Sequence, residues 1–128
     1  MILLDSHVLI WALARPEKIG KQLRRRLESA GWVYFSPIST FELNMAFLSG
    51  RAPKMPEDFQ KKLQELAFTE LQFSQGASDC AKNFINLVKT DPFDWMLVSQ
   101  AQSAGCDFYT ADQRLLSLGY PFIKDATL

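Results

Sequence analysis

Short apolar segments alternate with longer amphipathic segments along the chain, and this alternation restricts the fold more than any other feature of the sequence. Ile2–Leu4 is the clearest short segment, because it ends directly at Asp5 and is followed by the apolar run 8–14. Short buried strands that alternate with helices are typical of a parallel α/β sheet. We therefore expect a three-layer α/β fold, with helices flanking a central, mainly parallel sheet of four to five short strands.

The longer segments carry apolar residues at helical spacing, with capping or breaking residues at their ends. Helices are predicted over residues 8–14, 17–29, 39–49, 56–66, 74–88, 91–104 and 112–118. Strands are predicted over residues 2–4, 32–35, 70–73, 107–109 and 121–123. No repeat, low-complexity tract or linker interrupts this pattern. We expect residues 1–128 to form a single domain.

The composition points to a globular protein in a reducing compartment. The chain has 128 residues, of which 48% are hydrophobic, and this length supports a core without disulfide bonds. Cys80 and Cys106 have neither the number nor the spacing of a disulfide framework or metal site, so we expect two buried thiols. No apolar run approaches the ~18 residues of a membrane helix, and no basic leader precedes the first apolar residues. We expect a cytoplasmic protein that does not bind membranes.

Acidic residues follow several predicted strands, at the edge of an open α/β sheet where ligands bind. Asp5 ends the first strand, Glu42 lies one turn into the helix after the second, and Asp112 follows the strand at 107–109. Asp94 lies in the first turn of the helix that leads into that strand. Clustered carboxylates raise one another's pKa, and a hard cation such as Mg²⁺ or Mn²⁺ relieves the repulsion. The sequence therefore predicts a divalent metal site suited to phosphodiester hydrolysis.

Each acid also has a purely structural interpretation. Residues 39–42 match a capping box, in which the terminal Glu bonds back to the first residue of the helix. Residues 91–94 read as an N-cap, a proline at the first helical position and an acid favoured by the helix dipole. Asp112 fits the cap of a short helix. Asp5 is hardest to explain in this way, because a carboxylate between two apolar runs is costly.

Four motifs occur in a fixed order. Residues 3–11 join a strand through Asp-Ser-His to an apolar helix, and residues 38–43 centre on a glutamate. Residues 91–101 begin Asp-Pro-Phe-Asp, and residues 109–112 read Tyr-Thr-Ala-Asp. Together these motifs resemble the PIN-domain ribonucleases, and within them the VapC-type toxins of bacterial toxin–antitoxin pairs. The resemblance covers nearly the whole chain.

The resemblance implies that Asp5, Glu42, Asp94 and Asp112 are the catalytic acids. It implies that Asp5, Asp94 and Asp112 hold one or two Mg²⁺ or Mn²⁺ ions, while Glu42 completes the site or orients the attacking water. Asp94 takes the third position because the apolar helical stretch begins directly after it. Asp91 is interpreted as a cap with a supporting role.

Two hydroxyl residues and one histidine neighbour these acids in the sequence. Ser6 fits the hydroxyl that orients Asp5 or contacts phosphate. Thr110 fits a similar role, with a local bond at the end of its strand as the alternative. His7, the only histidine, is interpreted as a packed or helix-capping residue rather than a general base.

The activity implied is a divalent-metal-dependent endoribonuclease that cleaves a structured cellular RNA of the tRNA or rRNA class and leaves 5′-phosphate and 3′-hydroxyl ends. The implied partners are a cognate antitoxin and a second copy of the chain. The antitoxin tail is expected in a groove near the acids, which should be apolar with basic contacts and lined by exposed Phe and Leu residues of helices 39–49 and 56–66. The RNA path is expected along the basic residues Arg15, Lys18, Lys21, Arg24, Arg25 and Arg26, for which a solvated helix face is the alternative.

Two positions depart from the common family pattern. Trp95 replaces a basic residue after the Asp-Pro-Phe-Asp segment, and Ala46 replaces a lysine four residues after the motif glutamate. Neither change removes a carboxylate, so we expect metal binding to survive while substrate choice and rate change. The balance of 14 basic and 14 acidic residues excludes a general binder of polyanions. Setting the four catalytic acids aside leaves 14 basic residues against 10 acidic ones, which is compatible with a defined RNA target.

Two other classes of function remain open at this point. A PIN-fold protein that binds partners without cutting RNA is one, although the intact acids argue against it. A phosphoryl-transfer α/β domain is the other. A haloacid-dehalogenase phosphatase needs a second aspartate where this chain has His7, and a receiver domain needs a late lysine for which Lys124 is poorly placed.

Overall fold

The computed structural model describes residues 1–29 and 31–128. The strands are β1 (Ile2–Leu4), β2 (Val33–Phe35), β3 (Thr69–Glu70), β4 (Asp107–Thr110) and β5 (Ile123–Asp125). The α-helices are α1 (Ser6–Ala14), α2 (Lys21–Ser29), α3 (Pro37–Leu48), α4 (Phe59–Glu65), α5 (Gln75–Cys80), α6 (Pro92–Ala104) and α7 (Gln113–Leu116). Two 3-10 helices, η1 (Pro16–Lys18) and η2 (Ala81–Leu87), complete the described elements.

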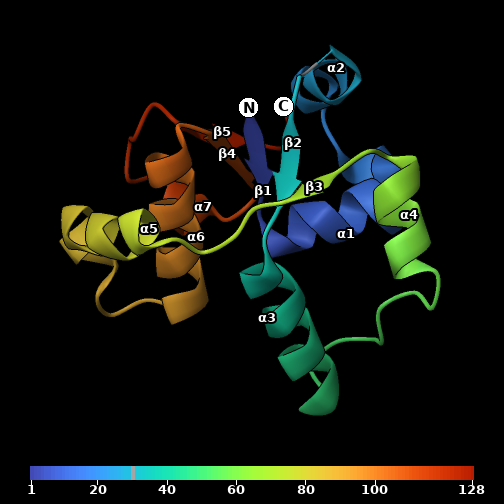
Figure 1. Ribbon diagram of the computed structural model, residues 1–128, viewed down its shortest axis with the longest axis horizontal. Helices are drawn as coiled ribbons and strands as arrows, with labels where there is room; N and C mark the ends of the chain where they lie inside the picture. Colours follow the sequence, from blue (N-terminus) through green and yellow to red (C-terminus); the bar gives the residue numbers. More distant parts are fainter. Residues whose placement is uncertain (30) are drawn as a thin grey trace.

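The five strands form one sheet in the order β3-β2-β1-β4-β5, and every neighbouring pair is parallel. The sheet lies between two groups of helices, with α1, α2 and α4 on one side and α5, α6 and α7 on the other (Figure 1). This arrangement confirms the predicted three-layer α/β fold with a parallel central sheet.

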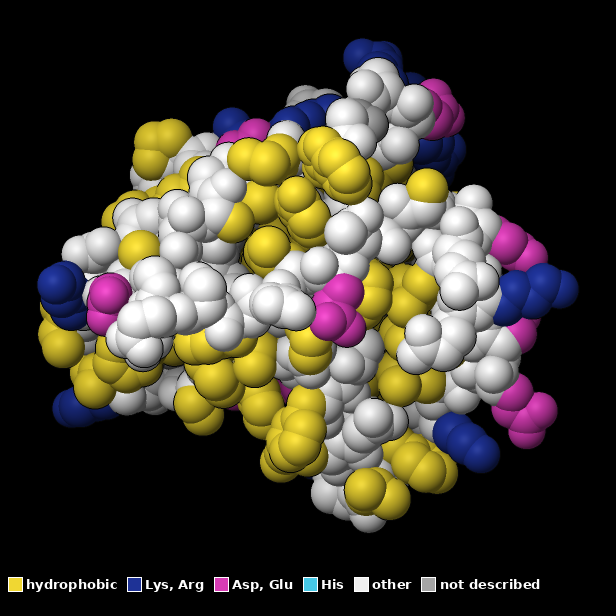
Figure 2. Space-filling model, viewed as in Figure 1, with side chains coloured by type: hydrophobic (Ala, Val, Ile, Leu, Met, Phe, Trp, Pro, Cys, Tyr) yellow, Lys and Arg dark blue, Asp and Glu magenta, His cyan; other side chains and the backbone are white. Residues whose placement is uncertain are grey.

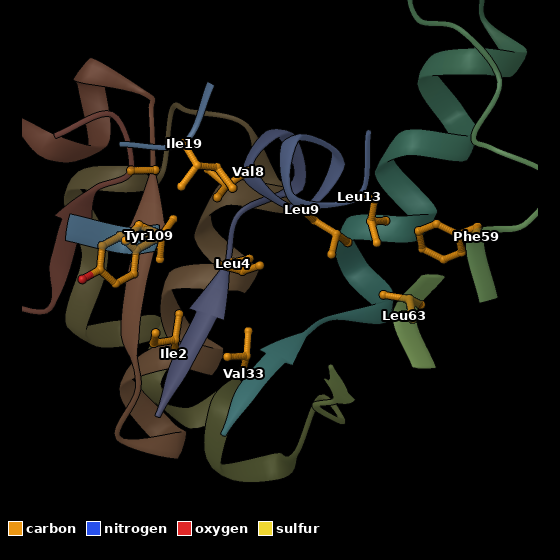
Figure 3. Close-up of a cluster of buried hydrophobic side chains, with 12 residues drawn as sticks. Ile2, Leu4, Val8, Leu9, Leu13, Ile19, Val33, Phe59, Leu63 and Tyr109 are labelled. Carbon is orange, nitrogen blue, oxygen red and sulfur yellow. The ribbon is translucent and has the colours of Figure 1, made fainter. Parts of the chain in front are cut away.

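Both faces of β1 are buried, and this explains why all three of its residues are apolar. Ile2 and Leu4 point into one buried cluster with side chains of α1 and α4 (Figure 3). Leu3 points to the opposite face, into a second cluster with side chains of α6 and β4. Successive side chains of a strand alternate between faces, so a strand covered on both sides must be apolar throughout.

Pairing of β1 with β4 brings distant polar residues together. Leu4 is opposite Tyr109, and the Asp5 N–H donates to the Tyr109 carbonyl at 3.0 Å. The next residues along both strands, Asp5 and Thr110, therefore meet at the carboxyl edge of the sheet. Two residues that are 105 positions apart in the sequence are thus in direct contact.

Two predicted helices are interrupted in the structure. The helix predicted over 17–29 divides into η1 and α2, because the backbone is extended at Ile19 and Gly20 packs against the C-terminus. A Cβ at Gly20 would lie 2.0 Å from the Leu128 carbonyl oxygen, so only glycine fits there. The helix predicted over 74–88 begins at its expected cap, Ser74, but is broken at Phe84. The Phe84 ring is fully buried against two aromatic rings, and this packing outweighs regular helix geometry.

The predicted start of the helix at Ser39 is wrong. Ser36 is the N-cap of α3, its Oγ accepts from the Ile38 N–H at 3.1 Å, and Pro37 occupies the first helical position. Serine before proline is a standard start signal, and it lies three residues before the one chosen from the sequence. Ser39 is therefore inside the helix, and the predicted capping box with Glu42 does not form.

The remaining boundaries differ by a few residues. The predicted strands 70–73 and 121–123 are Thr69–Glu70 and Ile123–Asp125, and the helix predicted over 56–66 is confined to Phe59–Glu65. The helix predicted over 91–104 is confirmed, with Asp91 as its cap and Gly105 in the left-handed conformation after its end. The last predicted helix, 112–118, is Gln113–Leu116 with Asp112 as its cap.

The cysteines and the helix lengths bear on two further expectations. Both thiols are free, Cys106 is buried as expected, and Cys80 is only half-buried. Within residues 1–29 and 31–128, none of the helices combines the length and the apolar character required to span a bilayer.

A polar bridge ties α6 to the residues that directly follow β2 and β3. Gln100 is 1% exposed, its Oε1 accepts from the Ser36 hydroxyl at 2.6 Å, and its Nε2 donates to the Leu71 carbonyl at 2.9 Å. We expect Gln100→Leu to lower the free energy of unfolding by about 1–3 kcal/mol, because the buried Ser36 hydroxyl and the partly buried Leu71 carbonyl both lose their side-chain partner. Urea denaturation measures this, and a loss under about 0.5 kcal/mol would show that the bridge is unimportant.

Candidate functional site

One cavity of about 370 Å³ collects the acidic residues singled out from the sequence. It opens beyond the carboxyl ends of β1 and β4, next to the first turns of α1 and α6. Its lining residues are Asp5, His7, Trp11, Glu42, Asp91, Asp94, Ala111, Asp112 and Arg114. The structure thus brings together all four predicted catalytic acids and adds Asp91, so five carboxylates face one small volume.

Asp5 is held in a fixed orientation from two sides. The Thr110 hydroxyl donates to its Oδ2 at 2.6 Å, and the Ser6 N–H donates to its Oδ1 at 2.7 Å. Asp5 is 5% exposed, and burial raises the pKa of its carboxyl above the usual 3.8 despite these two hydrogen bonds. Thr110 is therefore a partner of Asp5 across the sheet and also accepts locally from the Asp112 N–H at 3.0 Å.

Ser6 connects Asp5 to Glu42. The Ser6 backbone contacts Asp5, whereas its hydroxyl donates to Glu42 Oε1 at 2.6 Å. The structure thus directs the Ser6 side chain to Glu42 rather than to Asp5. Burial raises the pKa of Glu42, and the Ser6 hydrogen bond opposes that rise. Glu42 Oε2 remains available to face the cavity.

Asp94 is buried among the other four carboxylates of the cavity. It lies in the first turn of α6 and is 8% exposed. Burial, and then the negative charges of its neighbours, raise the pKa of Asp94 to about 7. Those neighbours are Asp5, Asp91, Glu42 and Asp112. A carboxylate in such a field favours a bound proton or cation.

Asp91 and Asp94 differ in their environment although both line the cavity. Asp91 Oδ1 accepts from the Phe93 N–H at 2.9 Å, so Asp91 is the N-cap of α6, as expected. Asp94 accepts no hydrogen bond from the residues that the structure describes and lies 3.9 Å from the Arg114 guanidinium. The oxygens of Asp94 are therefore free for a ligand.

Arg114 is a lining residue that the sequence reasoning missed. Its Nη2 donates to Asp112 Oδ2 at 2.9 Å, and its backbone N–H donates to Asp112 Oδ1 at the same distance. This pairing holds the pKa of Asp112 below its usual value. Its position in the sequence could have indicated this role, because Arg114 comes two residues after the last motif aspartate, in the first turn of a short helix.

His7 does not fit its predicted role. It is exposed in the first turn of α1 and lines the cavity, so the expectation of a packed residue is wrong. Its neighbours Ser6 and Val8 are buried, and the helical turn directs the side chain between them outward.

The basic residues predicted along the RNA path separate into two groups. Arg26 pairs with Asp107, the first residue of β4, and Arg24 donates to the carbonyls of Pro16 and Ile19. The Arg26 contact lies at the amino edge of the sheet, opposite the acids, where α2 is seen in Figure 1. Lys18 instead lies over the ring of Trp11, 5.6 Å from its centroid, and Trp11 lines the cavity.

The donor set suits a hard divalent cation that keeps much of its hydration. Every acid in the cavity offers carboxylate oxygens, and the raised pKa of Asp94 records an excess of negative charge. Among the described residues, no three acids, histidines or cysteines are close enough to form a complete cage. Mg²⁺ is commonly held by one or two carboxylates with water filling the other positions, so this geometry fits it.

The fold is similar to that of several solved structures. VapBC2 from Rickettsia felis bound to a promoter DNA fragment matches with a TM-score of 0.69 and 16% identity, covering 98% of both chains. A toxin–antitoxin complex from Klebsiella pneumoniae matches with a TM-score of 0.65 and 17% identity, again over 98% of both chains. DNA-bound VapBC from Salmonella typhimurium matches with a TM-score of 0.63 and 18% identity, covering 97% of this chain and 96% of the other.

The sequence comparisons address the family directly. A search of curated proteins finds no significant match. The family model of the PIN domain matches residues 2–119, which include all four motifs and all five cavity carboxylates. This match spans most of the chain, and the chain belongs to the PIN domain family.

Proposed function

We propose that the protein is a divalent-metal-dependent endoribonuclease that acts as the toxin of a toxin–antitoxin pair. PIN domains are in general nucleases. The observation that carries the proposal is the convergence of five carboxylates on one cavity, with the pKa of Asp94 raised to about 7. Two of these acids, Asp5 and Asp94, are buried, and like charges that are buried together destabilise the fold unless a proton or cation offsets them.

The chain's own residues divide the chemistry among them. Asp5, Asp94 and Asp112 would present oxygens to one or two cations that keep much of their water shell, and the Thr110 hydroxyl and the Ser6 N–H hold Asp5 in orientation. When bound, Mg²⁺ or Mn²⁺ lowers the pKa of a water and offsets charge on the phosphate.

Glu42 and Arg114 have separate proposed roles, at the attacking water and at the phosphate. Glu42, whose pKa is raised by burial and which lines the cavity, would complete the site or orient the attacking water. Arg114, next to Asp112, supplies positive charge for a phosphate oxygen.

The solved relatives with this fold are toxin–antitoxin complexes, which supports an antitoxin as the partner of this chain. A cavity of about 710 Å³ between α3 and α4 is lined mostly by apolar side chains, with one lysine and one glutamate: Asn44, Phe47, Leu48, Lys54, Met55, Pro56, Glu57 and Phe59. Leu48 is 81% exposed, and Figure 2 shows hydrophobic side chains gathered at the lower end of the molecule, where α3 ends. We propose this apolar groove with its lysine as the antitoxin site, and a cytoplasmic homodimer as the assembly.

The substrate proposed is a structured RNA of the tRNA or rRNA class, cleaved to a 5′-phosphate and a 3′-hydroxyl. Lys18, a member of the predicted basic path, contacts the ring of Trp11, which lines the acidic cavity. The receiver-domain alternative loses support, because that fold has the strand order 2-1-3-4-5 and this sheet does not.

The test is cleavage of total cellular RNA by the purified chain with Mg²⁺, with Mn²⁺ and with EDTA. We expect new 5′-phosphate ends with either metal, and none with EDTA. Sequencing of RNA 5′ ends after induction in cells names the substrate through a dominant site. An RNA pool left intact by the folded wild type with both metals would favour a partner-binding module without activity.

A further inference from the structure

A second cavity, of about 460 Å³, adjoins the acidic one. It shares His7, Glu42 and Asp91 with the acidic cavity and extends to Ala46 and Arg51. Arg114 lines only the first of these two cavities, and Arg51 lines only the second. The two cavities therefore form one furrow, with the carboxylates in its middle and an arginine on either side.

The end of α3 places Arg51 at this position. Gly50 adopts φ = +76°, its N–H donates to the Phe47 carbonyl at 3.0 Å, and the Arg51 N–H donates to the Ala46 carbonyl at 2.8 Å. These two bonds form a Schellman motif, which reverses the chain at a helix end. Arg51 is thereby returned beside Ala46, one helical turn after Glu42.

The Arg51 guanidinium keeps most of its donors free. Its Nε donates to the Ser49 hydroxyl at 2.9 Å, and no carboxylate of the described residues pairs with it. Arg24, Arg26 and Arg114, by contrast, are bound to carbonyls or carboxylates. A free planar guanidinium is suited to bind phosphate through two parallel hydrogen bonds.

We propose that Arg51 binds a backbone phosphate next to the scissile one, so that the RNA strand crosses the acids from the Arg114 side to the Arg51 side. This inference rests on the proposed nuclease function. A furrow with five carboxylates repels RNA, and cations at its two ends are needed to hold the strand over them. Arg51 thus supplies positive charge on the side of the furrow where position 46 is alanine.

The test measures binding and turnover separately. In an Asp94→Asn background with Mg²⁺, which prevents cleavage, the affinity for a short fluorescein-labelled single-stranded RNA is measured by anisotropy over a range of salt. We expect Arg51→Gln to weaken binding roughly tenfold and to reduce the salt slope by about one, as for the loss of one phosphate contact. In the wild-type background, Arg51→Gln should raise KM and leave kcat within about threefold.

Two matched variants control the experiment. Arg51→Lys keeps the charge and should recover most of the affinity, whereas Lys82→Gln removes an exposed positive charge on η2 and should change nothing. If the wild type cleaves RNA but Arg51→Gln retains its affinity, salt slope and KM, the proposed path is wrong and the nuclease function stands. A wild type that neither binds nor cleaves RNA overturns both.

Discussion

Asp94→Asn is expected to abolish metal-dependent RNA cleavage, with a loss of at least about 100-fold in kcat/KM. Asparagine keeps the shape of the side chain but removes one of the negative charges that attract the cation. The same change should raise the Tm of the metal-free protein at pH 8, because it removes a buried charge whose pKa is raised to about 7 by burial and by four acidic neighbours. Initial rates with Mn²⁺ and thermal scans with EDTA measure the two effects.

Asp91→Asn is the matched control for this substitution. Asp91 lines the same cavity and carries the same charge, but its oxygen caps α6. Asparagine caps a helix as well as aspartate does, so stability should hardly change. We expect activity within about tenfold of wild type, as for a residue outside the first coordination sphere. Equal losses in the two variants would contradict the assignment of Asp94, rather than Asp91, as the third ligand.

The metal-free protein should lose stability as the pH rises from about 4 to 7. Over this range the unfolded Asp94, with its usual pKa of 3.8, ionises while the native residue stays protonated up to about 7. The native state then binds more protons than the unfolded state, so the free energy of unfolding falls with pH and becomes level above 7. Asp5 and Glu42, whose pKa values are also raised, act in the same direction. Asp112, whose pKa is lowered, contributes stability that is lost only below about pH 4.

Metal binding should show the opposite dependence. A cation needs the ionised carboxylate, so its apparent affinity should fall about tenfold for each pH unit below 7 if one proton is displaced. The increase in Tm caused by Mg²⁺ should therefore be larger at pH 8 than at pH 6. Thermal scans from pH 5 to 9 with and without Mg²⁺ measure both trends. The Asp94→Asn variant should flatten the metal-free curve, and a wild-type Tm that rises between pH 5 and 7 would refute the assignment.

The fold was predictable because its signals are local. Ile2–Leu4 must be buried on both faces, Gly105 ends a helix, and Asp91-Pro92 begins one, and each of these is decided within a few residues. The wrong start at Ser39 came from overlooking the local signal at Ser36, whereas the two interrupted helices are cases in which tertiary packing outweighs local preference. Phe84 breaks a helix to reach its aromatic partners, and the chain at Gly20 makes room for the C-terminus.

In the candidate site, too, some features could be predicted from local sequence signals and others depend on tertiary contacts. The sequence alone was enough to predict four acids that the structure places around one cavity. Asp5 and Asp112 could be found because they come just after strands of a parallel sheet, where apolar residues give way to acidic ones. Only the tertiary structure decided their partners: Thr110 for Asp5, Ser6 for Glu42, Arg114 for Asp112. It also decided that His7 is exposed and that Arg51 adjoins the acids while Arg26 does not. Such pairings depend on strand order and helix packing, which join residues from distant parts of the chain, and no local pattern encodes them.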